Sequence, residues 1–163
     1  MKEISETEMY RKAASYCAEA ERCIQDVAKK IERAGLSPEA AERIIARLLR
    51  EGFINETRYC RSFVNDKLRF NKWGRIRIGA ELRKKGVAAA ASEPALQDID
   101  ETEYRQILFQ LLKAKKQTTK GKDERDCYYK LLRFAAGRGF EPSLAGKCLR
   151  DLFNGNDYDD VVD

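Results

Sequence analysis

Residues 75–87, RIRIGAELRKKGV, contain the pattern that decides the fold. Ile78 and Leu82 are one helical turn apart, so they lie on the same face of a helix. Gly86 follows, with the apolar Val87 directly behind it. Glycine readily adopts the left-handed backbone conformation in which many helices end. The stretch therefore predicts a helix that stops at Gly86 and turns.

The same pattern occurs three times along the chain. Gly35, Gly86 and Gly139 are 51 and 53 residues apart. Around each glycine, apolar residues stand eight and four positions before it and one position after it: Val27, Ile31 and Leu36; Ile78, Leu82 and Val87; Leu131, Ala135 and Phe140. A period near 50 residues with helical spacing is typical of helical repeats whose neighbours stack.

We therefore predict an all-α protein of three tandem three-helix repeats that form an elongated, curved helical array. The predicted parts are an N-terminal extension (1–9), three repeats (10–57, 58–102 and 103–153), and an acidic tail (154–163) that we expect to be disordered. Ser37-Pro38 marks the start of one helix, and Asn55 can cap another that begins at Glu56. In the second repeat Pro94 interrupts the third helix unless the helix restarts at this proline, so we expect that helix to be short or late.

Composition excludes several kinds of chemistry. The 163 residues include no histidine, which rules out Ser-His-Asp and Cys-His catalysis and every zinc site that needs histidine. The sequence also contains no phosphate-binding loop and no dinucleotide-binding glycine motif. We expect no enzymatic activity, no metal and no cofactor.

The chain has the character of a cytoplasmic protein. The N-terminal residues, MKEISETEMYRK, are too polar for a secretory signal, and no run of 18 apolar residues could cross a membrane. The five cysteines are odd in number and form no CxxC pair, so we expect free thiols in a reducing compartment.

Charge is unevenly distributed along this chain of net charge +5. Residues 58–87 contain ten basic and two acidic side chains, whereas residues 151–163 contain five aspartates and no base. We expect little neutralisation of the basic segment within the chain, with Glu81 pairing Arg77 or Lys85 one turn away. The excess suits phosphates or an acidic protein surface. The candidate binding residues are Lys67, Arg69, Lys72, Trp73, Arg75, Arg77, Arg83, Lys84, Lys85, Lys113, Lys115, Lys116, Lys120 and Lys122.

Each of these features also has a plain structural interpretation. The first basic segment can be a solvated helix face, and residues 113–126, expected to form a loop, can simply be flexible. Trp73 either packs between repeats, or stacks on a base or anchors a protein interface. If the basic face is functional, replacing Arg75 and Arg77 with glutamate is expected to keep the fold and abolish the activity.

Two adjacent segments, GFINETRYCRSFVNDKL (52–68) and NKWGRIRIGAELRKKGV (71–87), resemble the RecX family of bacterial RecA regulators. The first repeat, EAERCIQDVAKKIERAGLSPEAAERIIARLLREGFI, is similar to the opening repeat of that family, and the resemblance covers most of residues 10–153. The matching positions are Gly52, Phe53, Arg58, Tyr59, Phe63, Val64, Lys72, Gly74, Arg77, Ile78, Glu81, Leu82, Lys85, Gly86 and Val87. The family's paired acids correspond here to Asn55-Glu56, and its usual serine to Cys23.

The resemblance implies an all-helical modulator without catalytic activity. RecX proteins bind RecA, the recombinase of bacterial DNA repair and the SOS response, and lie along the groove of its filament on DNA. There they restrain ATP hydrolysis, strand exchange and coprotease activity, and some bind DNA weakly themselves. The implied partners are thus the RecA filament and single- or double-stranded DNA, and we expect a monomer.

Two other classes of function remain open from the sequence. A stand-alone nucleic-acid-binding helical protein would bind DNA tightly, with a steep dependence on salt. A helical scaffold for another protein would leave RecA unaffected when its basic residues are changed.

Overall fold

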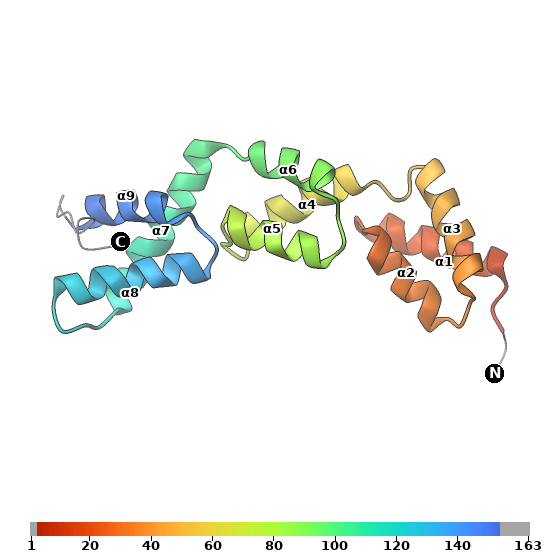
Figure 1. The fold of residues 1–163 in the computed structure, drawn as a ribbon, viewed down its shortest axis with the longest axis horizontal. Coiled ribbons are helices and arrows are strands. Elements are labelled where there is room, and N and C mark those ends of the chain that lie inside the picture. The colour runs from red at the N-terminus through yellow and green to blue at the C-terminus, as the bar shows by residue number, and fades with distance from the viewer. Residues whose placement is uncertain (1–2, 154–163) are drawn as a thin grey trace. The chain divides into compact units, whose positions relative to one another are not determined.

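The structure is a computed structural model, and it describes residues 3–153. Over this range the chain forms nine α-helices and no strand, which confirms the all-α prediction (Figure 1). The helices are α1 (Glu6–Glu19), α2 (Ile24–Arg33), α3 (Pro38–Arg50), α4 (Glu56–Arg69), α5 (Arg75–Lys84), α6 (Ala89–Gln97), α7 (Glu101–Thr118), α8 (Glu124–Gly137) and α9 (Pro142–Leu152).

The predicted helix starts are confirmed by their capping hydrogen bonds. The hydroxyl of Ser37 accepts a hydrogen bond from the Ala40 amide at 3.2 Å, and proline occupies the first position of α3. The side-chain oxygen of Asn55 accepts one from the Arg58 amide at 3.0 Å, so α4 begins at Glu56. Such caps satisfy amides that have no partner inside the helix.

The repeated glycine pattern has the predicted conformation. Gly35, Gly86 and Gly139 have φ angles of +88°, +73° and +91°, which side chains with a Cβ rarely adopt. The apolar residues eight and four positions before each glycine are fully buried: Val27, Ile31, Ile78, Leu82, Leu131 and Ala135. The turn and the apolar stripe therefore recur together, as in a structural repeat.

The prediction that Pro94 interrupts the helix is wrong, whereas the prediction of a short helix is confirmed. The helix runs from Ala89 to Gln97 without a break. Pro94 lacks the amide that would bond to the Ala90 carbonyl one turn earlier. Both residues are exposed, so water can satisfy that carbonyl. Ser92 and Ala95, on the buried side of α6, hold the helix in place.

The chain divides into two compact units. Unit 1 comprises Met1–Phe63 with Glu81–Ala95, and unit 2 comprises Val64–Ala80 with Leu96–Asp163. The divisions fall inside α4, α5 and α6, so the helices of the predicted second repeat contribute to both units. This is expected where a single repeat is too small to bury its own apolar face.

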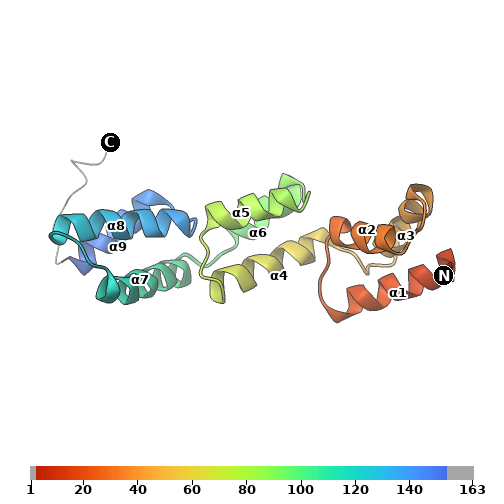
Figure 2. The same cartoon turned by 90° about the horizontal axis from the view of Figure 1, so that it is seen from below.

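Each unit has its own apolar core. In unit 1, α1, α2 and α3 lie side by side (Figure 1) around a core of Met9, Ala13, Cys17, Val27, Ile31, Ile44, Leu48 and Ile54. In unit 2, both views place α7, α8 and α9 together (Figures 1 and 2). There the ring centroids of the buried Tyr104 and Phe140 lie 5.2 Å apart, and those of the buried Tyr128 and Phe153 lie 6.0 Å apart.

The repeat boundaries stay a prediction. α1 starts at Glu6 and buries Met9, inside the segment predicted as an extension. The acidic tail lies outside the described residues. Within residues 3–153, none of the helices has the length and apolar character needed to cross a membrane.

Candidate functional site

The turn between α4 and α5 lies at the centre of the predicted basic segment. Lys72 adopts a left-handed φ of +57°, which is uncommon for a residue other than glycine. Its ammonium donates a hydrogen bond to the Arg69 carbonyl, and the Trp73 amide bonds back to the Lys67 carbonyl at 3.0 Å. These bonds hold the turn tightly against the end of α4.

The start of α5 is fixed to the turn that follows α8. The Gly74 amide donates to the Arg138 carbonyl at 2.8 Å, and the Ile76 amide donates to the Gly139 carbonyl at 3.0 Å. A Cβ on Gly74 would lie 2.4 Å from the Gly139 carbonyl oxygen. Only glycine permits this approach, so the first amides of α5 are occupied and cannot bind an anion.

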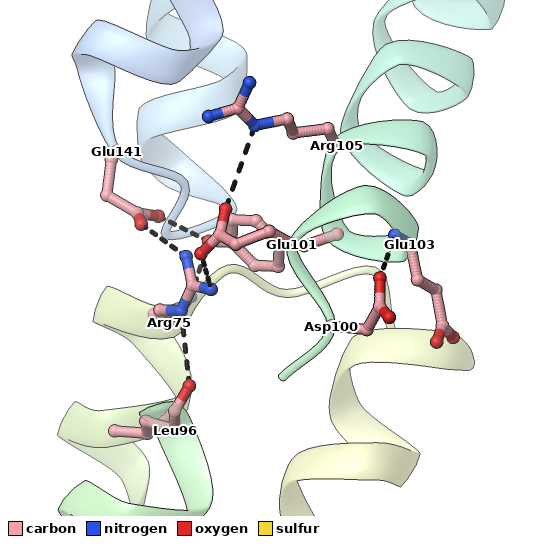
Figure 3. Close-up of polar contacts among 8 residues, drawn as sticks. Arg75, Leu96, Asp100, Glu101, Glu103, Arg105 and Glu141 are labelled. Atoms are coloured by element: carbon pink, nitrogen blue, oxygen red, sulfur yellow. Dashed lines mark hydrogen bonds and ion pairs between the residues drawn. The ribbon is translucent and has the colours of Figure 1, made fainter. Parts of the chain in front are cut away.

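Arg75 is the most strongly held basic residue of the segment (Figure 3). Its guanidinium forms ion pairs with Glu141, at 2.9 Å, and with Glu101, and it donates to the Leu96 carbonyl at 3.3 Å. It also lies over the Tyr104 ring, 4.1 Å from the centroid. The side chain is only 20% exposed, so Arg75 is a structural residue of unit 2.

Tyr104 completes the Arg75 cluster. Its hydroxyl accepts a hydrogen bond from the Arg75 amide at 2.9 Å and donates one to Glu141. Burial, together with the bond to Glu141, raises the pKa of Tyr104 well above its ordinary value. Burial opposes the charge on Arg75, but the bonds to Glu141 and Glu101 outweigh it and raise the Arg75 pKa. The cluster therefore keeps a neutral phenol beside a fixed ion pair.

The expectation of poor neutralisation within the chain is wrong. Besides Arg75, the predicted binding residues with an ion pair inside residues 3–153 include Arg69 with Glu103 at 2.7 Å, Lys84 with Glu81 at 3.3 Å, and Lys85 with Asp26 at 2.9 Å. Most of these acids lie far away in the sequence, where local charge counting cannot find them. Glu81 pairs with Lys84 rather than with Arg77 or Lys85.

Lys85 belongs to a junction within unit 1 that resembles the one at Arg75. The Asp26 carboxylate also accepts a hydrogen bond from the Cys23 amide at 3.4 Å, at the start of α2. The Gln25 side chain donates to the Lys84 carbonyl at 3.3 Å. The end of α5 thus contacts the start of α2, as the turn after α8 contacts the start of α5.

The prediction that glutamate at both position 75 and position 77 keeps the fold is wrong. A glutamate at position 75 would place a third carboxylate beside Glu101 and Glu141. Arg77 is also held, because its guanidinium lies 4.2 Å from the Trp73 ring centroid. Lys67 lies 5.1 Å from the same ring. The half-buried Trp73 therefore has a structural role in packing these cations.

Other predicted residues remain open to a partner. Arg83, Lys113, Lys120 and Lys122 are exposed, and none forms an ion pair within residues 3–153. Phe70, at the end of α4, is 80% exposed, which is unusual for a large apolar side chain. These residues, unlike Arg75, are therefore accessible to a partner.

The lysine-rich segment is mostly helical, so the loop prediction for residues 113–126 is wrong up to Thr118. Lysine, alanine and glutamine favour helices, and α7 continues through them. Lys115 and Lys116 lie over the Phe134 and Phe153 rings, 5.0 and 4.3 Å from the centroids. Lys116 also donates to the Leu152 carbonyl at 2.7 Å, so it fastens α7 to the end of α9.

A hollow of about 430 Å³ lies along α7 beside Lys72. Ile107, Leu111 and Ala114 form its apolar floor, and Glu103 and two glutamines line it as well. No cluster of three potential metal ligands occurs in the part of the chain that the structure describes. A turn with the exposed Phe70, the half-buried Lys72 and a nearby apolar hollow is suited to contact a macromolecule. Fold and site together define a helical-repeat binding protein.

Comparison with known proteins identifies the family. Residues 55–96 match the family described as "RecX, second three-helix domain". "Regulatory protein RecX" of Pseudomonas putida (strain GB-1) is 31% identical over 150 residues, which cover 92% of each chain. The protein of the same name from Amycolatopsis mediterranei (strain U-32) is 25% identical over 153 residues, covering 91% of this chain and 87% of the relative. The chain belongs to the RecX family, the regulatory proteins whose partner is RecA.

Solved structures show the same fold. The crystal structure of RecX from Lactobacillus salivarius superposes with a TM-score of 0.81 and 19% identity, covering 91% of this chain and 97% of that one. Another RecX crystal structure gives 0.77 and 20% identity, covering 93% of this chain and 74% of that one. The arrangement of helices is therefore shared even where the side chains differ.

Proposed function

We propose that this protein binds the RecA filament on DNA, as a monomer in the cytoplasm, and restrains its ATP hydrolysis, strand exchange and coprotease activity. Membership of the RecX family supplies the partner. The observation that carries the site is the set of exposed cations without ion pairs within residues 3–153, together with the exposed Phe70. Inhibition follows if the bound protein holds RecA subunits in one arrangement while ATP turnover requires them to move.

We propose that unit 2 makes two kinds of contact, one with RecA and one with DNA. Phe70 and Lys72 lie on the same turn, and an apolar residue beside a charged one is typical of an anchor in a protein interface. Lys113, Lys120 and Lys122 offer mobile, compact charges, which suit phosphate oxygens of the DNA in the filament. We assign the turn to RecA and these lysines to DNA.

The assignment is tested by RecA-catalysed ATP hydrolysis on single-stranded DNA. Lys113→Glu with Lys120→Glu is expected to weaken inhibition, because charge reversal repels phosphates. Arg133→Glu with Lys147→Glu is the matched control, since it reverses two other exposed charges of unit 2. If both pairs inhibit as well as the unaltered protein does, the lysines are only a solvated surface.

Phe70→Ala tests the protein contact separately. We expect it to reduce affinity for the RecA filament while leaving direct binding to bare DNA unchanged. An equal loss of both would assign Phe70 to the nucleic acid. Stand-alone nucleic-acid binding, the other candidate, has no observation in its favour that the family assignment does not explain.

A further inference from the structure

We propose that unit 1 carries a second binding site, a groove between α1 and α2 that takes the phosphates of a nucleic-acid strand. Two adjoining hollows of about 330 and 350 Å³ share Tyr16 and Lys30. Arg11 and Lys12 line the first hollow, and Arg33 lines the second. Four cations thus border these two neighbouring hollows, which together are here called the α1–α2 groove.

The carboxylates at the edge of the α1–α2 groove are already occupied. Glu19 pairs with Arg22 at 3.4 Å, and Asp26 pairs with Lys85 at 2.9 Å. Within residues 3–153, no carboxylate lies within ion-pair distance of the four groove cations: Arg11, Lys12, Lys30 and Arg33. The groove therefore has an uncompensated positive charge, although the first 57 residues together hold one more acid than base.

Helix electrostatics explains only half of this charge. Lys30 and Arg33 are in the last turn of α2, where cations stabilise the negative end of the helix dipole. Arg11 and Lys12 are in the middle of α1, where that effect is absent. The two helices thus present cations to the same groove, and the helix dipole accounts for only one of the two pairs. This points to an anionic ligand.

The α1–α2 groove suits the backbone of a nucleic acid rather than its bases. The Tyr16 ring is engaged by Arg22, 3.8 Å from the centroid, and by Lys30, at 4.7 Å. Arg22 also donates to the Tyr16 carbonyl at 3.1 Å, which fixes this arrangement. A ring used in this way holds cations in place instead of stacking on bases, so we expect binding without base preference.

A nucleic acid fits the groove better than an acidic protein does. Protein interfaces combine charge with an apolar or aromatic centre. The side chains that border the groove are mainly basic and polar, and its one aromatic ring is covered by cations. This site is separate from the residues proposed above to contact RecA, and it can be tested with DNA alone.

The test is binding of the full chain to a fluorescein-labelled oligothymidylate, measured by anisotropy across a chloride series. Lys12→Gln with Lys30→Gln removes two groove charges. We expect about tenfold weaker binding at low salt, and a slope of log K against log salt that is shallower by about 1.4, as for two lost phosphate contacts on a single strand. Lys29→Gln with Arg50→Gln removes the same charge from exposed positions outside the groove and should leave the slope unchanged.

Arg11→Gln with Lys12→Gln is a second groove variant that leaves the Lys30–Tyr16 contact intact, and it should reproduce the loss. Equal effects of groove and control variants would overturn the proposal, as would an unaltered protein that does not bind the oligonucleotide. Unchanged DNA binding with weakened RecA binding would reassign the groove to an acidic protein surface. Displacement by inorganic phosphate beyond its ionic-strength effect would show a site for small anions. Inhibition of RecA by the unaltered protein is a separate measurement, and its result does not depend on any of these outcomes.

Discussion

Arg75 shows how a residue chosen for its charge can turn out to have a structural role. Its acidic partners, Glu101 and Glu141, are 26 and 66 residues away, and its backbone amide bonds to Tyr104. No local sequence pattern predicts such contacts, because they form only when α5, α7 and the start of α9 pack together. The sequence located the basic segment but could not separate cations that hold the fold from cations that face solvent.

Replacing Arg75 with glutamine is expected to destabilise the protein by about 1–3 kcal/mol, since it leaves two carboxylates without their charged partner in a partly buried cluster. Urea unfolding followed by circular dichroism measures the loss. Arg105→Gln is the control, because its pair with Glu101 is long, at 3.8 Å, and both side chains are more than half exposed. An Arg75 variant as stable as the control would contradict the structural role.

The Asp26–Lys85 pair predicts a pH dependence of stability. Burial opposes the charge on Asp26, but the bonds from Lys85 and Cys23 outweigh it and lower the Asp26 pKa below the ordinary value of 3.8. Because the folded-state pKa is depressed, the stabilisation is complete above 3.8 and is lost as the pH falls through the lower folded value.

Unfolding free energies measured from neutral pH to below pH 4 should therefore fall less steeply for Asp26→Asn than for the unaltered protein. Lys85→Gln should flatten the same part of the curve, since it removes the partner. Lys84→Gln, a neighbouring change at an exposed pair, should leave the curve unaltered. Identical slopes for all four proteins would exclude a contribution from this pair.

At the scale of elements, the glycine turns and apolar stripes were predictable, because they depend on local conformation and spacing. Gly139 adds a constraint that the sequence does not reveal. Besides its φ of +91°, a Cβ there would lie 2.3 Å from the Arg77 Cβ. Gly35 has a similar φ, but no atom lies within 4 Å of the same added carbon. Comparing substitutions at these two glycines therefore distinguishes the cost of backbone strain from the cost of a steric clash.

Gly35→Ala should cost about 1–2 kcal/mol, the strain of a left-handed residue alone. Gly139→Ala should cost clearly more, because the backbone of α5 must also move away. Chemical denaturation of both variants gives the comparison. Equal losses would mean that the start of α5 does not pack on the turn after α8.

The α6 and α7 helices show where pattern reasoning at this scale fails. Pro94 is tolerated inside α6 because the carbonyl it leaves unbonded is exposed, and exposure is a property of the folded molecule. Residues 113–118 were assigned to a loop because of their polarity. They continue α7 because their intrinsic helix propensity is high, and Lys116 packs on Phe153.

At the scale of the whole molecule, the repeat and its motif were sufficient to identify the family from sequence. The period places buried residues of α2, α5 and α8 in equivalent positions. The α1–α2 groove was missed because residues 1–57 are nearly neutral in total. Its only signal is helical spacing, with Lys12 and Tyr16 one turn apart on α1 and Lys30 and Arg33 one turn apart on α2.

The most direct test is the rate of ATP hydrolysis by RecA on single-stranded DNA as this protein is added below one copy per RecA subunit. We predict that the rate falls when few copies are present per filament, because each bound molecule restrains neighbouring subunits. An unchanged rate even at equal molar amounts would contradict regulation of the filament by this protein.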